Sequence, residues 1–207
     1  DIYYFAKENL EYQRLDKQFK EKKQWISGLP KLKTISQIFK ERGGYVIIGT
    51  VKGSDMLDWE YEGPFDELDA QRKIGGYPFI NSDLKKKGLT AILCHRIIDG
   101  GKDSIGSDVV VSGEGTGIVH TAPGCGAIDS KIALKEEIVS IAPLNEESCY
   151  IDGFGKYTGK NATNIETTKE ILSDLKEKGF LLYQEQYPHV YPHCWRSGDE
   201  LVFRIVD

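Results

Sequence analysis

The chain has 207 residues, 40% of them hydrophobic, which is enough to bury one ordinary core or one core with an attached subdomain. Its net charge of −5 argues against a uniformly basic nucleic-acid-binding body, and its lysine runs at 17–23 and 85–87 are either local phosphate contacts or solvated faces. No stretch approaches the roughly 20 apolar residues of a membrane span, and the first residues lack a signal-peptide core. We therefore expect a soluble, cytoplasmic protein that does not bind membranes.

A charged helical hairpin is predicted over residues 1–44, with a break near residues 28–30. Leu32, Ile35 and Phe39 recur at helical spacing before two glycines end the pattern. From residue 45 the composition changes: short segments rich in β-branched and aromatic residues alternate with Gly, Asp and Ser. These segments predict a β-rich core with helices over residues 45–207, with strands near 45–51, 59–65, 88–98 and 108–113.

A second strong helix is predicted after residue 160, where Asn161 or Asn164 can cap the start and Gly179 ends it. The last residues, 180–207, read as two strands around a turn rich in Pro, His and aromatic residues. Strands and helices are mixed without a regular βαβ repeat, so we expect a mixed α/β (α+β) fold. We find no internal repeat and no linker, and predict a single domain over residues 1–207.

The most informative segment is GTGIVHTAPGCGAID, residues 115–129, which predicts a strand, a glycine-rich turn and the start of a helix. His120 lies at the end of the strand, and Asp129 lies in the first turn of the helix. Backbone N–H groups in such a turn, together with a carboxylate and an imidazole, could hold a small polar ligand with an ammonium or ester group. The simpler interpretation makes Asp129 a helix cap and His120 a packed strand residue.

The four cysteines are scattered without a Cys-x-x-Cys pair, so we expect neither a zinc knuckle nor a disulfide framework. His189, His193 and Cys194 lie close together in the sequence, but four metal ligands with suitable spacing cannot be assembled from this stretch. We therefore expect no metal site.

Segment 115–129 closely resembles the signature of the editing domain inserted in isoleucyl-tRNA synthetases. The resemblance extends to KGSDMLDWEYEGPF at residues 52–65 and to LKEKGFLLYQEQYPHVYPHCWRSGDELVFR at residues 175–204. The related valyl and leucyl editing domains share the Gly-Thr-Gly opening and the Asp. A His directly after Gly-Ile-Val and the Tyr-Pro-His-Cys-Trp-Arg segment are most similar to the isoleucyl branch.

This resemblance implies a β-barrel-like editing domain with flanking helices, which hydrolyses valine wrongly attached to the isoleucine tRNA. The implied partners are the acceptor end of tRNA(Ile) carrying valine and the remainder of the synthetase chain. The parent enzyme would be an ATP-dependent isoleucine–tRNA ligase, with ATP and Mg²⁺ in its synthetic site and no cofactor in this domain. Valine would fit a small hydrolytic pocket from which isoleucine, one methylene larger, is excluded.

The resemblance also implies a role for individual residues. Asp129 would bind the substrate α-ammonium group by a charge-assisted hydrogen bond and so orient the ester carbonyl. His120 would line the amino-acid pocket and limit the size of the side chain that enters. The turn would supply backbone groups near the terminal adenosine and the attacking water; its residues are Thr121, Ala122, Pro123, Gly124, Cys125 and Gly126.

The sequence departs from the family pattern in several places. Cys125 stands where the family usually has His or Phe, and Ser130 stands where it has Tyr or Leu. The Cys125 thiol is either a nucleophile or a small packed side chain, and no base is evident beside it. The family's Thr-rich segment and the His-x-Gly-His and Lys-Met-Ser-Lys-Ser signatures are missing from these residues, so we expect an excised domain.

Two further functions stay open on the sequence alone. One is a noncatalytic module that binds the tRNA acceptor end or serves as a structural insertion. The other is a free-standing deacylase that acts on mischarged tRNA in trans. The second is less favoured, because residues 201–207 read as a strand cut in the middle.

Overall fold

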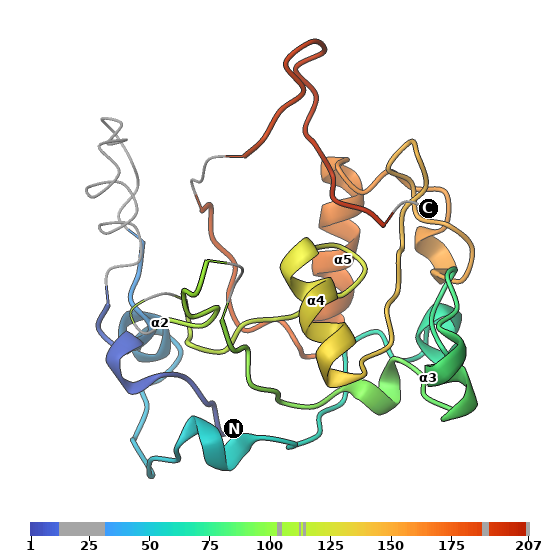
Figure 1. Ribbon diagram of the computed structural model, residues 1–207. Helices are drawn as coiled ribbons and strands as arrows, with labels where there is room; N and C mark the ends of the chain where they lie inside the picture. The colour runs from blue at the N-terminus through green and yellow to red at the C-terminus, as the bar shows by residue number, and fades with distance from the viewer. Residues whose placement is uncertain (13–31, 103–104, 112, 114, 188–190, 206–207) are drawn as a thin grey trace. The chain divides into compact units, whose positions relative to one another are not determined.

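The computed structural model describes residues 1–12, 32–102, 105–111, 113, 115–187 and 191–205 (Figure 1). The predicted hairpin break, the lysine run at 17–23 and His189 lie outside these residues. Within them, no helix is long and apolar enough to cross a membrane. The α-helices are α2 (Ile35–Glu41), α3 (Ser82–Lys86), α4 (Ala127–Glu136) and α5 (Ile165–Glu177), and the 3₁₀ turns are η1 (Lys7–Asn9), η2 (Gly53–Met56), η3 (Asp69–Arg72), η4 (Ile92–Cys94) and η5 (Gly155–Tyr157).

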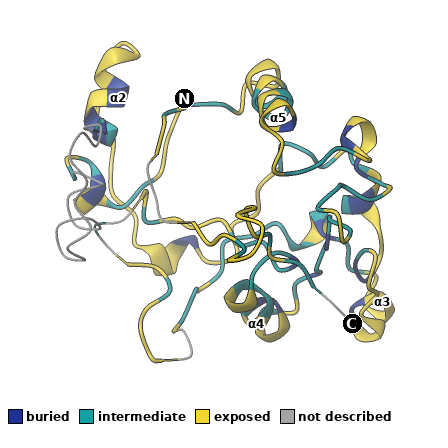
Figure 2. Cartoon of the chain, turned by 90° about the horizontal axis from the view of Figure 1, so that it is seen from above, coloured by how far each residue is buried: buried dark blue, intermediate teal, exposed yellow. Residues whose placement is uncertain are grey.

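The expected mixed α/β fold with a β-barrel-like core is wrong for the part of the chain that the structure describes. No β-strand forms there, and pairing is limited to isolated bridges such as Glu60–Arg96 and Tyr77–Ile141. Part of the predicted strand at 88–98 forms η4 instead. Residues 46–51 are exposed throughout and make no hydrogen bond to a described residue (Figure 2). Apolar, β-branched residues favour strands only where a neighbouring segment supplies ladder partners, and none does so here.

The chain divides into two compact units, which are described separately. The first comprises Asp1–Lys52, Gly100–His120 and Tyr183–Val190, and the second comprises Gly53–Asp99, Thr121–Leu182 and Tyr191–Asp207. The expectation of a single domain over residues 1–207 stays a prediction.

Helix α2 organises the first unit. Thr34 caps its start by a capping box, in which the Thr34 hydroxyl accepts the Gln37 N–H and the Gln37 side chain accepts the Thr34 N–H. Gly43 and Gly44 follow the helix with positive φ angles, as the sequence predicts. The buried ring of Phe39 contacts the rings of Tyr3, Phe5 and Tyr45, which gives this unit its aromatic core.

The Gly-Thr-Gly opening of the motif also belongs to the first unit and has a packing role. Asn9 is almost fully buried, donates from its side-chain amide to the Gly115 carbonyl and accepts the Gly113 N–H. The Ala6 N–H donates to the Thr116 carbonyl over 2.7 Å. A Cβ on Gly117 would lie 2.4 Å from the Cβ of Ala6, so glycine is required for this close approach.

Two small clusters of buried side chains lie among the described residues of the second unit. One consists of Ala70, Phe154 and Tyr157, and the other of Leu84, Ala91 and Val139. Ile141 packs against both clusters and therefore joins them. Because each cluster is small, we expect polar contacts between segments to contribute a sizeable part of this unit's stability.

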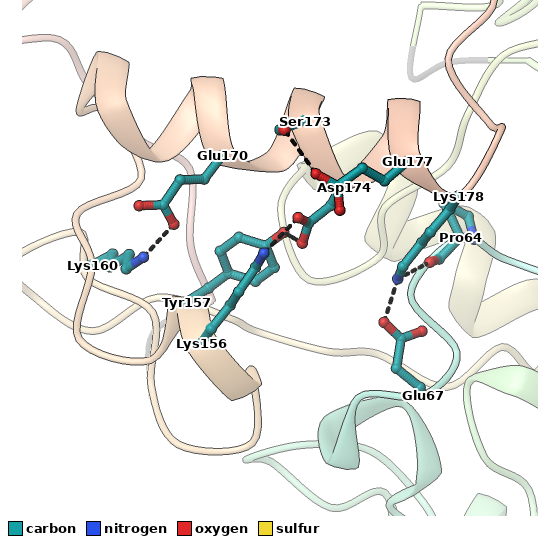
Figure 3. Close-up of polar contacts among 10 residues, drawn as sticks. All are labelled: Pro64, Glu67, Lys156, Tyr157, Lys160, Glu170, Ser173, Asp174, Glu177 and Lys178. Carbon is teal, nitrogen blue, oxygen red and sulfur yellow. Dashed lines mark hydrogen bonds and ion pairs between the residues drawn. The ribbon is translucent and has the colours of Figure 1, made fainter.

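Helix α5 is held in the second unit by a row of polar contacts along one side (Figure 3). Lys160 pairs with Glu170, and Lys156 and the Tyr157 hydroxyl both contact Asp174. Beyond the end of the helix, Lys178 contacts the Pro64 carbonyl and the Glu67 carboxylate. Asn164 caps the start of α5 and Gly179 follows its end with a positive φ, which confirms both boundaries predicted from the sequence.

Candidate functional site

The sequence predicts a site at residues 121–129, and the second unit folds this segment as a tight turn leading into α4. The Cys125 N–H donates to the Ala122 carbonyl over 2.9 Å, which closes a turn with Pro123 at its second position. The Gly126 carbonyl then accepts the first helical hydrogen bond, from the Ser130 N–H. The predicted turn and the start of the helix near Asp129 are confirmed, whereas the predicted strand before them is not formed.

Gly124 lies directly against the backbone of a distant segment. A Cβ at this position would lie 1.6 Å from the Ile141 carbonyl oxygen and 2.9 Å from the Ala142 nitrogen. Both neighbours are backbone atoms, so they cannot move aside as a flexible side chain can. The requirement for glycine here comes from this close approach, which fixes the turn against the core of the unit.

Asp129 is the third residue of α4, and its carboxylate points back to the turn. Its Oδ2 atom accepts the Ala122 N–H over 3.2 Å. The side chain is partly buried, and no other described residue forms a hydrogen bond or an ion pair with this carboxylate. Oδ2 therefore orders the turn, and Oδ1 has no hydrogen bond with a described residue.

The first turn of α4 also presents backbone donors. Gly126 precedes the helix without a side-chain cap, and the N–H groups of Ala127, Ile128 and Asp129 have no acceptor among the described residues. The N-terminus of a ten-residue helix carries a partial positive charge and favours a negatively charged or carbonyl oxygen nearby. A carboxylate for a cationic group and N–H donors for an oxygen thus occur within one helical turn.

Cys125 is half-buried beside Asp129 and Tyr150. Burial, and secondarily the negative charge of Asp129, raise the pKa of the Cys125 thiol. Burial, followed by the proximity of Cys125, raises the pKa of the Tyr150 hydroxyl. A thiol with a raised pKa is a poor nucleophile at neutral pH, which supports the interpretation of Cys125 as a small packed residue.

The other end of α4 is anchored by an arginine from a separate segment. Arg96 donates to the Glu136 carbonyl over 2.8 Å, and its guanidinium group lies 3.8 Å from the Glu136 carboxylate. A cation at a helix C-terminus is favourable because the terminal carbonyls carry partial negative charge. This contact, with the seating of Gly124 at the other end, sets the position of Asp129 within the unit.

His120 and Thr121 fall on either side of the boundary between the two units. His120 is exposed in the first unit, and its side chain forms no hydrogen bond with a described residue. Thr121 is partly buried in the second unit and leads directly into the turn. The expectation that His120 and Asp129 line one pocket stays a prediction.

A cavity that the sequence did not predict lies beside α4. Its volume is about 420 Å³, within the range of small-molecule sites. Ser130 is its one lining residue from segment 115–130. No signal in the sequence indicates that residues of α3 and α4 line one cavity, because they lie about 50 positions apart in the chain. The lining residues are Gly75, Phe79, Ile80, Asn81, Asp83, Leu84, Ser130, Ala133, Leu134, Glu137, Ile138 and Ser140.

Comparison with known proteins finds sequences similar to this chain among the isoleucine–tRNA ligases. Over 164 residues the chain is 33% identical to the isoleucine–tRNA ligase of Sulfolobus acidocaldarius, a match that covers 79% of this chain and 13% of that protein. The isoleucine–tRNA ligase of Methanocaldococcus jannaschii is 29% identical over 202 residues, or 95% of this chain and 17% of the ligase. The proteins to which this chain is similar are isoleucine–tRNA ligases. No protein-family model matches the chain.

A eukaryotic relative agrees with these two. The probable cytoplasmic isoleucine–tRNA ligase of Dictyostelium discoideum is 28% identical over 179 residues, which is 83% of this chain and 14% of that protein. The chain therefore spans between 13% and 17% of the length of these three isoleucine–tRNA ligases. The similarity extends over 79% to 95% of the chain in these three matches, which supports a resemblance to isoleucyl-tRNA synthetases. The assignment to their editing domain stays a prediction.

Proposed function

We propose that the chain is the editing domain of an isoleucine–tRNA ligase and that it hydrolyses valine wrongly attached to tRNA(Ile). The observation that carries the proposal is the partly buried Asp129 carboxylate, which keeps one oxygen available beside the N–H groups that open α4. The family of the relatives supplies the substrate class, an amino acid esterified to tRNA(Ile).

The need for such a step is physical. One methylene in an apolar pocket is worth only about 1–3 kcal/mol of discrimination, and the isoleucine and valine pair is the standard illustration of this limit. A second site that accepts valine and excludes isoleucine adds discrimination that binding at the first site cannot supply. The ligase's ATP and Mg²⁺ would serve amino-acid activation outside these residues.

In the proposed reaction, Asp129 binds the α-ammonium group of the valyl ester. The first N–H groups of α4 lie on the same helical turn and stabilise the negative charge that develops on the ester carbonyl oxygen. A water oxygen attacks the carbonyl carbon, the bond to the terminal ribose oxygen breaks, and that oxygen leaves with a proton, giving valine and free tRNA. His120 limits the size of the amino-acid side chain, and residues 121–126 contact the terminal adenosine.

The test measures hydrolysis of valyl-tRNA(Ile) and isoleucyl-tRNA(Ile) by the full-length ligase that carries this segment. Asp129→Ala removes the charge, and Asp129→Asn keeps an acceptor for the Ala122 N–H without the charge. Because a hydrogen bond to a charged group is worth about 1.5–3 kcal/mol, both variants should hydrolyse valyl-tRNA(Ile) at least about tenfold more slowly. Asp152→Ala, an exposed acid in the same unit, is the matched control and should keep the wild-type rate. Equal rates in all four proteins would contradict the proposal.

A second candidate is a noncatalytic module that binds the tRNA acceptor end. It is favoured by the Ala122 N–H bond, which gives Asp129 a purely structural task as the acid of the first helical turn. This candidate predicts tRNA binding without hydrolysis by the wild-type ligase. It also predicts that Asp129→Asn, which retains the acceptor oxygen, preserves the stability of the unit.

A further inference from the structure

Residues 191–201 of the second unit form a hairpin that the proposed reaction does not use. The His193–Glu200 bridge pairs its two arms, the Leu201 N–H donates to the Pro192 carbonyl, and the Tyr191 hydroxyl donates to the Leu201 carbonyl. In Figure 1 this hairpin is the red loop whose arms run side by side.

The tip of the hairpin is closed by several hydrogen bonds of its own. The Cys194 N–H donates to the Asp199 carbonyl over 2.8 Å, and the Gly198 N–H donates to the Cys194 carbonyl over 2.8 Å. The His193 Nδ1 atom lies 3.0 Å from the Gly198 carbonyl oxygen. The backbone that carries the tip side chains is therefore held in one conformation, which lowers the entropy lost when they bind a partner.

Trp195 at this tip is 87% exposed, the largest exposed fraction among the large hydrophobic side chains that the structure describes. The guanidinium carbon of Arg196 lies 5.0 Å from the centre of its ring. Arg196 forms no ion pair with a described carboxylate, including those of Asp199 and Glu200 on the facing arm. An exposed tryptophan and an arginine without an ion pair to a described carboxylate thus lie together at the tip, with the guanidinium group over the ring.

The surroundings of Trp195 decide which partner fits this surface. A tryptophan that anchors a protein interface lies within a desolvated apolar patch. Here the residues that follow Trp195 around the tip are polar or charged, Arg196, Ser197 and Asp199, whereas the exposed apolar side chains of Tyr191 and Leu201 lie at the open end of the hairpin. An unpaired nucleobase needs only a flat aromatic face and a nearby cation for its phosphate, and every base can stack in this way.

We propose that Trp195 stacks on an unpaired base of the single-stranded 3′ end of a tRNA, while Arg196 contacts the adjoining phosphate. This inference rests on the proposed function, which supplies the tRNA end as substrate. The hairpin holds the unpaired end and acts as a binding element separate from Asp129, which acts on the ester.

The experiment measures binding of the 207-residue chain to a labelled four-nucleotide RNA, ACCA, and to an RNA hairpin in whose stem the same four nucleotides are paired. Trp195→Ala should weaken binding of the single strand about fivefold or more, because stacking on an aromatic ring contributes about that much per base. Trp195→Phe should stay within about threefold of the wild type, since it retains a stacking face. Phe203→Ala, which removes a 62% exposed aromatic ring from the same unit, is the matched control and should bind as the wild type does.

Several results would overturn the inference. These are equal affinity of Trp195→Ala and the wild type, no binding of the single strand by the wild type, and equal binding of the RNA hairpin in which the four nucleotides are paired. A Trp195→Ala variant that binds RNA normally but loses self-association would instead make the tip a protein contact. Ester hydrolysis is measured separately in the full-length ligase with Asp129→Ala. If Trp195→Ala binds RNA as the wild type does but Asp129→Ala slows hydrolysis, only this inference is overturned. If neither variant differs from the wild type, the proposed function is overturned too.

Discussion

Gly124 and Ile141 meet backbone to backbone, with room for only 1.6 Å between a Cβ on Gly124 and the Ile141 carbonyl oxygen. Gly124→Ala should therefore displace the turn or the 141–142 segment and lower the free energy of unfolding by about 1–3 kcal/mol or more. Urea unfolding followed by circular dichroism checks this. Gly53→Ala, at a glycine with open space around it and no positive φ, is the control and should change stability little. A Gly124→Ala protein as stable as the wild type would contradict the close approach.

Tyr157→Phe should lower the free energy of unfolding at neutral pH by roughly 1–3 kcal/mol, because it removes a hydrogen bond to the Asp174 carboxylate. Tyr3→Phe is the matched control, since the Tyr3 hydroxyl donates to an exposed Asp1 carboxylate. Urea midpoints of the three proteins give the comparison. A loss as large for Tyr3→Phe as for Tyr157→Phe would argue against a special contribution from Asp174.

The same tyrosine predicts an alkaline dependence of stability. Burial, followed by the hydrogen bond to Asp174, raises the pKa of Tyr157 above its ordinary value of 10.0. A raised pKa means that the folded state holds the phenolic proton more tightly than the unfolded state does. This contribution is complete below about pH 10 and is lost as the pH rises above it. Wild-type stability should fall more steeply than that of Tyr157→Phe as the pH rises from about 10 to about 12. Parallel curves would contradict the assignment.

Asn164→Ala should cost about 1 kcal/mol of stability, because the Asn164 side chain accepts the Glu166 N–H at the start of α5. Asn164→Asp keeps an acceptor at the cap and adds a negative charge near the helix N-terminus, so it should match or exceed the wild type. Thermal unfolding of the three proteins distinguishes them. If both variants lost the same stability, the side chain would be needed for something other than capping.

The cysteines should differ in their reaction with alkylating reagents. Burial and the Asp129 charge raise the pKa of the Cys125 thiol. Hydrogen bonds from the Ser197 hydroxyl and from the backbone N–H groups of Ser197 and Arg196 lower the pKa of the Cys194 thiol. Because the thiolate is the reactive form, iodoacetamide should modify Cys194 faster than Cys125 near neutral pH. Peptide mass spectrometry over time gives both rates, and denatured protein, in which the two should react alike, is the control.

Local signals in the sequence predicted part of this fold. The start of α5 at Asn164 and its end at Gly179 follow from capping chemistry, and the opening of α4 before Asp129 follows from the glycine-rich turn. Both signals depend on a few neighbouring residues. Strands could not be predicted in the same way. Residues 45–51 have a strand-like composition, but a strand needs a ladder partner, and composition does not say whether one is near.

In the candidate site, too, local features were predictable from the sequence and long-range contacts were not. The position of Asp129 near a glycine-rich turn was predictable because both lie in one short segment. Two contacts join residues far apart in the chain, and no periodicity in the sequence indicates them: the approach of Gly124 to Ile141 and the hydrogen bond from Arg96 to the end of α4. The same holds for the cavity lined by residues of α3 and α4.

Ile141 packs against both buried clusters of the second unit, and its carbonyl oxygen faces Gly124. A larger residue at position 124 would therefore displace the glycine-rich turn and also disturb the packing of Ile141 against both clusters. A mutational scan scored only by hydrolysis would rank Gly124 beside Asp129, although one serves packing and the other is proposed to touch substrate. Abundance of folded protein has to be measured for each variant before any loss of activity at this motif is assigned to chemistry.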